Sequence, residues 1–199
     1  MDVRVFSGEM NKQYFKKLNR VSARIIAMFS ALLMGVAVAH SPAVAQSEAV
    51  ETTAYKDWVV RCVQRDSLPP CDAVQSLTNR ETNQTIMISS IAYLGNSEQI
   101  GVQIFMPTGI LVSGGVLFEI DGETRALENL QFTRCEANGC FIEAITDEDG
   151  LSPLKKGKQA AVAVLNSNGE PRVNGLSLSG FTAAFKEVQA KNAAWYAQQ

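Results

Sequence analysis

The sequence is nearly without histidine, and this scarcity limits its chemistry more than any other feature of its composition. The single histidine, His40, stands near the end of a segment that has the features of an export signal. Removal of that segment would leave a protein without histidine, which is the commonest general base in enzymes and the commonest ligand of metal ions. We therefore expect no catalytic site, no metal site and no cofactor.

The sequence also lacks an apolar run long enough to cross a membrane. Its longest apolar run covers residues 25–39, whereas a membrane-spanning helix needs roughly 20 residues. Five Lys and Arg residues between Lys12 and Arg24 precede this run, as in the positive segment of a signal peptide. The alternative is an uncleaved anchor, which the shortness of the run disfavours.

Small residues after the apolar run provide a cleavage site. Ala43 and Ala45 stand at the third-last and last positions before Gln46, and Ala37 and Ala39 form a weaker alternative. We predict that residues 1–45 are a signal peptide and that the mature chain covers 46–199, without a membrane span. The expected location is the periplasm, with outer-membrane association or secretion as further alternatives.

The predicted mature chain has no excess of basic residues. Twelve of the eighteen Lys and Arg residues and eighteen of the twenty acidic residues lie after residue 45, so its net charge is near −6. This sign argues against a nucleic-acid partner, because phosphate recognition depends on clustered Lys and Arg side chains. It argues equally against attachment to anionic lipid by charge alone.

Short strand-like segments dominate the predicted mature chain. Segments rich in β-branched and aromatic residues and ended by turn residues cover 55–63 (which contains Trp58), 85–93, 100–106, 116–120, 124–127, 131–135, 140–145, 160–165 and 171–178. Asp121 and Gly122 form a two-residue hairpin turn between two of them. We predict a mainly β fold over 55–199, an antiparallel β-sandwich or barrel-like domain, preceded by a mobile lead-in over 46–54.

The last segment differs because its apolar residues recur at a helical period. Phe181, Phe185 and Val188 fit one face of a helix that begins at Gly180 or Phe181, with Ser179 as a suitable capping residue. We predict a C-terminal amphipathic helix that buries both phenylalanines against the β core. A short helical turn is also expected over 151–156.

Four cysteines remain after the predicted cleavage, and an even number in an oxidising compartment indicates two disulfides. Of the three connectivities, we favour Cys62–Cys71 and Cys135–Cys140, because each pair spans a short, turn-rich segment that brings its ends together. A zinc site would need thiolate pairs at about two-residue separation or histidine partners, and the predicted mature chain contains neither.

Two arrangements deserve comparison with enzyme chemistry. Ser152 and Lys155 match the S-x-x-K motif of penicillin-binding enzymes, but the companion motifs S-D-N and K-T-G are absent. Glu119, Asp121 and Glu143 would form a hydrolase site if the fold brought two of these carboxylates together. A hydrolase with carboxylate or Ser-Lys chemistry is therefore the enzymatic alternative.

Several segments together resemble the invasion-associated locus B family over residues 55–188. The segments are Trp58–Cys62, Pro107–Leu111, Ile120–Gly122, Phe132–Cys135 with Gly139–Cys140, and Ser177–Ala184. The sequence departs from the family pattern at Ser113, where Pro is usual, and at Ser179, where Lys is usual. The resemblance implies a secreted envelope protein, associated in the founding pathogen protein with entry into red blood cells, and it implies no catalytic residue.

The leading functional hypothesis is a non-enzymatic envelope protein that binds a protein or another envelope component, with a role in host-cell contact or invasion as the resemblance implies. Exposed loops usually carry recognition in such scaffolds, so the segments 65–70 and 96–99 are the expected contact regions. A structural or stress-related envelope factor without a dedicated ligand is a further alternative. The sequence predicts no oligomeric state.

Overall fold

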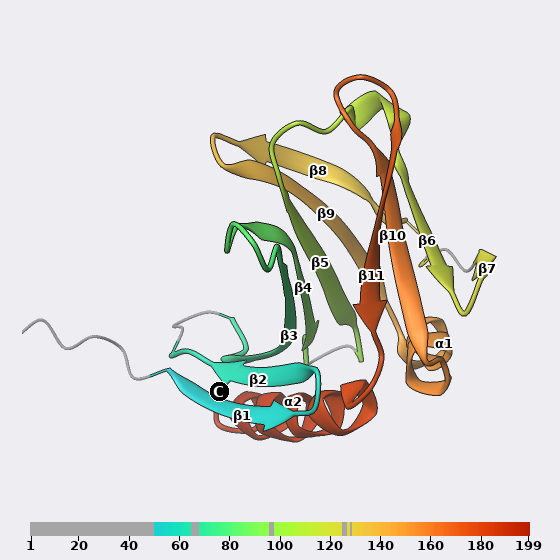
Figure 1. Ribbon diagram of the computed structural model, residues 1–199. Coiled ribbons are helices and arrows are strands. Elements are labelled where there is room, and N and C mark those ends of the chain that lie inside the picture. Colours follow the sequence, from blue (N-terminus) through green and yellow to red (C-terminus); the bar gives the residue numbers. More distant parts are fainter. Residues whose placement is uncertain (1–49, 65–67, 96–97, 125–126, 128) are drawn as a thin grey trace, which may run out of the picture. The chain divides into compact units, whose positions relative to one another are not determined.

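Two antiparallel sheets make up most of the described part of the chain (Figure 1). The computed structural model describes residues 50–64, 68–95, 98–124, 127 and 129–199, which belong to the unit Ala45–Gln199. The predicted signal peptide, 1–45, lies outside the described residues, as do residues 46–49 of the predicted lead-in.

The larger sheet has seven strands in the order β1-β2-β3-β4-β5-β9-β8. Its strands are β1 (Glu51–Tyr55), β2 (Trp58–Cys62), β3 (Cys71–Thr78), β4 (Thr85–Tyr93), β5 (Ile100–Pro107), β8 (Gln131–Glu136) and β9 (Gly139–Thr146). Because β1 and β8 lie at opposite edges, this sheet does not close into a barrel.

The smaller sheet has four strands in the order β11-β10-β6-β7. Its strands are β6 (Val116–Ile120), β7 (Glu123–Thr124), β10 (Gln159–Leu165) and β11 (Pro171–Ser177). A 3-10 turn, η1 (Val112–Gly114), precedes β6, and the helices α1 (Glu148–Lys156) and α2 (Phe181–Tyr196) follow β9 and β11. The fold is a mainly β antiparallel sandwich with a C-terminal helix, which confirms the predicted fold class.

The core lies between the sheets because apolar residues alternate along the strands. In β5, Ile100, Val102, Ile104 and Met106 are all buried, whereas the residues between them are only half-buried. Alternate residues of a strand point to opposite faces of a sheet, so this pattern directs one face of β5 into the core. Residues such as Phe118 of β6 enter the same cluster from the smaller sheet.

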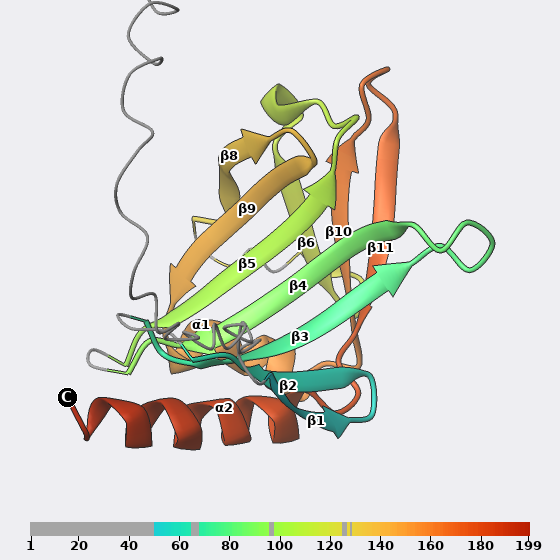
Figure 2. The same cartoon turned by 90° about the vertical axis from the view of Figure 1, so that its left-hand side faces the viewer.

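Helix α2 packs below β1 and β2 and buries the two predicted phenylalanines (Figures 1 and 2). The rings of Trp58 and Phe181 lie 4.9 Å apart between centroids, and those of Phe181 and Phe185 lie 6.0 Å apart. Trp58 is fully buried, and its indole N–H donates to the backbone carbonyl of Ser177 at 2.8 Å. An aromatic cluster therefore joins β2 to the helix.

The start of α2 differs from the expectation in its capping residue. Gly180, not Ser179, is the N-cap, and no side chain caps the helix. Gly180 has a φ of 90°, and a β-carbon there would lie 2.0 Å from the backbone oxygen of Tyr55. Only glycine meets both requirements, because other residues rarely adopt positive φ and have no space here.

The hairpin turn at Asp121 and Gly122 has positive φ at both residues, 52° and 83°, which matches the primed turn typical of two-residue hairpins. The Asp121 carboxylate also accepts hydrogen bonds from the backbone N–H groups of Lys158 and Gln159, at 3.0 to 3.1 Å. This aspartate therefore connects the β6–β7 turn to the start of β10.

Two disulfides join residues that lie directly opposite each other in hairpins. Cys62 pairs with Cys71 between β2 and β3, and Cys135 pairs with Cys140 between β8 and β9. Their Cα–Cα distances are 4.1 and 4.0 Å. This is the connectivity favoured from the sequence.

Some elements depart from the sequence-based expectation. The predicted mobile lead-in is wrong for Glu51–Ala54, which belong to β1 and pair with β2. Strand β3 was not among the predicted strands, and the expected turn over 151–156 is a nine-residue helix, α1. The predicted strand 124–127 falls partly on residues 125 and 126, which lie outside the described residues.

Candidate functional site: a polar groove on the seven-stranded sheet

The outer face of the seven-stranded sheet is concave. In Figure 1, β8 and β9 lean outward at the top of this face, and the β1–β2 hairpin projects to the same side at the bottom. Figure 2 shows the face directly, with β9, β5, β4 and β3 side by side across it. A groove of about 680 Å³ lies over these strands and is the candidate functional site.

A row of polar side chains crosses the groove because strand register places them opposite one another. Arg61 of β2 pairs with Asp72 of β3, Ser90 of β4 pairs with Gln103 of β5, and Gln103 pairs with Glu143 of β9. Directly opposite residues in an antiparallel pair share one face of the sheet. The register therefore gathers side chains that are far apart in the sequence.

The lower end of the row is an ion pair with an additional hydroxyl donor. Arg61 donates to Asp72 through Nε at 3.2 Å and through Nη2 at 2.7 Å, and the Ser90 hydroxyl donates to the same carboxylate at 2.8 Å. The Asp72 side chain is only 6% exposed, whereas that of Arg61 is 42% exposed. The hydrogen bonds to Asp72 raise the pKa of Arg61 above its ordinary value.

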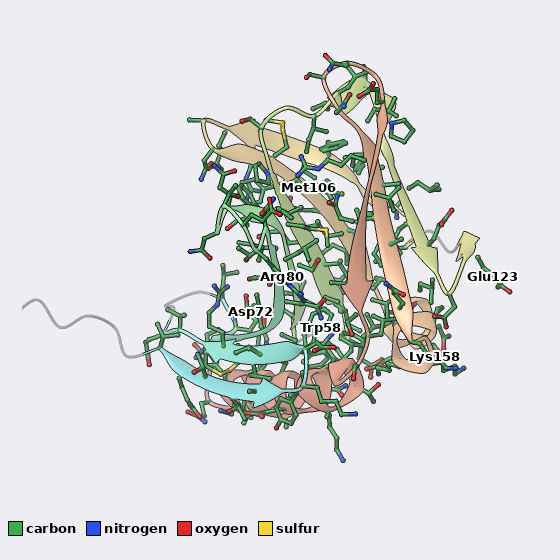
Figure 3. The ribbon with its side chains drawn as sticks, viewed as in Figure 1. Trp58, Asp72, Arg80, Met106, Glu123 and Lys158 are labelled. Carbon is green, nitrogen blue, oxygen red and sulfur yellow. A yellow bond between two sulfur atoms is a disulfide. The ribbon has the colours of Figure 1, made fainter. Side chains whose placement is uncertain are left out.

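Figure 3 labels Asp72 above the β1–β2 hairpin on the concave side, and Trp58 nearer the interior of the sandwich. The two residues belong to neighbouring strands, and both are buried. The buried Asp72 therefore belongs to the floor of the groove, not to the apolar core.

The upper end of the row is centred on Glu143. Its carboxylate accepts hydrogen bonds from Gln103 Nε2 and Thr133 Oγ1, both at 2.6 Å, and from Arg134 Nη1 at 2.7 Å. Burial opposes ionisation of Glu143, but these three donors outweigh it and lower its pKa. The bond to Glu143 in turn raises the pKa of Arg134.

Aromatic rings support Arg134 from below. Its guanidinium lies 3.8 Å from the centre of the Phe141 ring, and that ring lies 5.2 Å from the ring of Phe105. A cation over an aromatic face is attracted by the negative charge density of the ring. Arg134 is therefore held in place by the Glu143 carboxylate of the groove and by the Phe141 ring.

The part of the groove between its two charged ends is lined by small or uncharged side chains. Ala92 and Gly101 form part of its floor, and Leu94 and Ile145 add apolar surface, with Ile145 51% exposed. Among the described residues that line the groove, none is aromatic, and amide and hydroxyl groups such as that of Gln131 supply most of the polar surface. Both charged ends of the groove are thus paired within the protein.

The carboxylates considered for a hydrolase do not converge. Glu119 lies between the buried Phe118 and Ile120, so it points to the outer face of the smaller sheet. Asp121 binds backbone N–H groups at the β6–β7 turn, and Glu143 lies in the groove on the other side of the sandwich. The structure therefore gives no pair of these acids with the geometry of a glycosidase.

The Ser-Lys motif lies in α1, away from the groove. The amine of Lys155 binds Glu148 of the same helix and lies 5.0 Å from the centre of the Phe185 ring. Within the described part of the chain, Ser152 makes no hydrogen bond to Lys155. Lys155 thus has partners other than the serine that it would activate.

Asp147 and the four cysteines have structural roles. Asp147 caps α1, because its side chain accepts from the backbone N–H of Gly150 at 2.9 Å. All four cysteines form disulfides, and the described residues contain no cluster of three or more potential metal ligands. In the same residues, no helix combines the length and apolar character needed to cross a bilayer.

Sequence reasoning expected recognition in loops, whereas the groove is built mainly on strands. The segment 65–70 falls partly outside the described residues, because 65–67 are not described, and so does 96–99, because of 96 and 97. The sequence of β5 contained one indication of the groove, because the polar Gln103 lies on the face of the strand opposite the core. Its significance depends on the register with Ser90 and Glu143, which one strand alone does not reveal.

The fold and groove define a class of protein: an antiparallel β-sandwich with two hairpin disulfides and an open, internally neutralised polar groove. The family model described as invasion associated locus B (IalB) protein matches residues 58–189, and the chain belongs to this family. The resemblance found in the sequence is thereby confirmed.

A solved structure agrees with this assignment at the level of the fold. The crystal structure of invasion associated protein B from Bartonella henselae is similar with a TM-score of 0.62 and 22% sequence identity, over 70% of this chain and 96% of that chain. A search of curated proteins by sequence finds no match.

Proposed function

We propose that this IalB-family protein is an exported, non-enzymatic envelope protein that binds a protein or another envelope component in the groove of its seven-stranded sheet. The observation that carries the proposal is the row from Arg61 to Glu143, in which each charged group is already paired inside an open groove. Such a surface has a fixed shape and fixed polar groups, as a recognition site requires.

The state of the groove carboxylates supports binding over catalysis. A general acid or base needs a pKa near the working pH, which burial or a like charge usually provides. Glu143 has a lowered pKa and three donors, so at neutral pH it is ionised and fully engaged. Asp72 is similarly occupied by Arg61 and Ser90.

The chemistry of the lining supports a neutral partner. The amide groups of Gln131 and Gln103 offer both donors and acceptors, and Ile145 offers exposed apolar surface beside them. This combination fits an extended protein segment, whose backbone also carries alternating donors and acceptors. An anionic ligand would find no unpaired cation among the described lining residues.

Export is part of the same proposal. The predicted signal peptide over 1–45 and the two disulfides, Cys62–Cys71 and Cys135–Cys140, fit an oxidising compartment such as the periplasm. The family name associates relatives with invasion, so a host-cell component is one partner class within the proposal.

Site-specific photo-crosslinking tests the groove as a binding site. A photoreactive amino acid replaces Ile145 in the groove or Leu117 on the opposite sheet, positions that are 51% and 43% exposed and therefore equally reachable. In a first experiment, each protein is exported in the cells that naturally produce it and is irradiated there. In a second experiment, the protein is irradiated in the presence of host-cell membranes. Mass spectrometry identifies the crosslinked products of both experiments. We expect discrete adducts from position 145 and none of the same adducts from position 117.

A groove-filling variant supplies the control. Ala92→Gln places a longer, neutral side chain on the groove floor, and it should abolish the adducts from position 145 while the unfolding midpoint stays near that of the parent protein. Adducts that persist in Ala92→Gln, or that form equally from position 117, would contradict binding in the groove. Absence of adducts from position 145 in both settings would favour a structural or stress-related envelope factor.

A further inference from the structure

The two sheets have four edge strands, and one of them, β11, differs from the other three in its length and regular register. The edges are β1 and β8 in the larger sheet and β7 and β11 in the smaller sheet. An edge strand exposes N–H and C=O groups that can pair with another chain, and proteins commonly block this pairing with short strands, bulges, charges or a covering helix.

Three of the edges carry such a block. Strand β7 has only two residues, and β8 has a register shift between Phe132 and Arg134 as well as two charged residues, Arg134 and Glu136. Strand β1 is short and is bound to α2, since Glu51 pairs with Lys191 at 2.7 Å. These three edges are therefore poor templates for another strand.

Strand β11 carries no bulge and is longer than β1 and β7. Its seven residues, Pro171–Ser177, pair with β10 in an unbroken register, and Arg172 is its single charged residue. Figure 2 shows its outer side as the free edge of the smaller sheet. Its length and unbroken register make this edge more suitable for strand addition than the other three, although it carries Pro171 and Arg172.

The direction of the free backbone groups follows from Ser177. Its N–H and C=O bond to the side-chain amide of Gln75, both at 2.9 Å, so they point away from β10. Alternate residues of an antiparallel strand direct these groups to the same side, so those of Val173 and Gly175 also point away from β10. Among the described residues, the N–H groups of Val173 and Gly175 have no partner.

An apolar stripe leads to this edge on the outer face of the smaller sheet. Val173 is opposite Ala163 of β10, which is opposite Leu117 of β6. Val173 is 64% exposed and Leu117 is 43% exposed, and both are large apolar side chains. The stripe ends abruptly at β11, where Val173 has apolar neighbours on one side only.

We propose that β11 pairs antiparallel with β11 of a second copy of this chain, around a twofold axis at Val173. The two copies of Val173 then exchange N–H to C=O hydrogen bonds, and each Gly175 N–H donates to the Pro171 carbonyl of the other copy. Pro171 has no N–H to be left unpaired, and Gly175 has no side chain to obstruct the opposing proline ring. The smaller sheets of two copies become one eight-stranded sheet.

Self-complementarity is what favours a second copy over another partner. The twofold axis makes the stripe continuous, because Leu117, Ala163 and Val173 of one copy are followed across the axis by Val173, Ala163 and Leu117 of the other. Arg172 faces Asn174 across the axis, so the register brings no like charges together. Two short strands bury less surface than a stable dimer needs, so the dimer forms reversibly at high concentration.

Sedimentation velocity on the mature protein tests the pairing. Measurements from about 1 μM to about 1 mM cover the range in which weak complexes assemble. Val173→Lys places two ammonium groups opposite each other at the axis and should raise the dimer dissociation constant more than about 10-fold, because like charges directly opposite destabilise strand pairing. Leu117→Lys adds the same charge to the same face two strands from the edge, and should leave the constant within about 3-fold.

Amide hydrogen exchange provides an independent readout. We expect the amides of Val173 and Gly175 to exchange more slowly as the concentration rises in the parent protein and in Leu117→Lys, but not in Val173→Lys. A protein that stays monomeric throughout, or a dimer that Leu117→Lys dissociates as strongly as Val173→Lys, would overturn the edge pairing. Unfolding midpoints of both variants establish that they fold, as expected for substitutions at exposed positions.

Discussion

The two outer faces of the sandwich differ in what they expose. The concave face of the larger sheet presents charged side chains, but each is bound by a neighbour, as Glu143 is by Thr133 and Arg134. The outer face of the smaller sheet presents Leu117 and Val173, which are exposed and apolar. The comparison shows that polarity alone does not predict on which surface a substitution destabilises the fold.

The physical reason is the extent to which each side chain is already satisfied. Asp72 is polar but buried, so removing it leaves the partly buried Arg61 and Ser90 without the carboxylate that they bind. Val173 is apolar but exposed, so removing it loses little burial in the monomer. The polar face therefore has a structural role in addition to the binding role proposed for it, whereas substitutions on the apolar face should alter the proposed association more than the stability of the monomer.

Loss of the α2 anchor should have the largest effect, because α2 supports the β1–β2 hairpin below the groove. Phe185 is 1% exposed, and Phe185→Ala should reduce the free energy of unfolding by about 3–5 kcal/mol. Val173→Ala, at an exposed position, should change it by less than about 0.5 kcal/mol. Urea denaturation of both proteins checks this, and a loss below about 1 kcal/mol for Phe185→Ala would mark α2 as peripheral.

Asn192 tests how α2 is joined to the concave sheet, and we expect its replacement to have the next largest effect on stability. This fully buried residue of α2 accepts from the Cys71 N–H at 3.0 Å and donates to the carbonyls of Cys71 and Tyr93, at 2.9 and 2.8 Å. Asn192→Ala should cost about 3 kcal/mol, at about 1 kcal/mol for each hydrogen bond. The exposed Ala194→Ser in the same helix is the control, and equal losses in the two variants would refute the bridging role of Asn192.

Asp72 and Leu117 compare the two faces directly. Asp72→Ala removes the partner of Arg61 and the acceptor of the Ser90 hydroxyl, and should cost about 1–3 kcal/mol because Arg61 remains partly hydrated. Leu117→Ala should cost less than about 1 kcal/mol, because its side chain is 43% exposed. The comparison fails if truncation of the leucine proves more destabilising than truncation of the aspartate.

The smallest effect is a pH dependence from Glu143. Its pKa in the folded protein is below its ordinary value of 4.5, so ionised Glu143 stabilises the fold above that pH. This contribution is lost as the pH falls through the folded-state pKa. Parent protein and Glu143→Gln should therefore differ most in unfolding free energy above about pH 5 and converge in stronger acid. A difference that stays constant down to about pH 3 would refute the depressed pKa.

Local patterns were sufficient for much of the fold. The alternation in β5, the turn at Asp121 and Gly122, and the helical spacing of Phe181 and Phe185 each correspond to an observed element. These features depend on residues near one another in the chain, so a single sequence contains the necessary information.

The elements that sequence reasoning missed depend on distant partners. Strand β1 is polar, and its contacts with α2, such as that of Tyr55 with Glu187, are far apart in the sequence. Strand β3 contains Asp72 at a buried position, which interrupts the expected pattern until its bond to Arg61 is known. The groove also depends on distant partners, because its lining residues come together only when the strands pair in the observed register.

Amide chemical-shift mapping on isotope-labelled mature protein tests most directly whether partner binding and self-association use different faces. Dilution should shift the amides of 172–175, whereas addition of the crosslinked partner in purified form should shift those of groove residues such as Ser90, Gln103 and Ile145. Separate sets of shifted amides are the predicted result. A single set that responds to both dilution and partner would contradict the account.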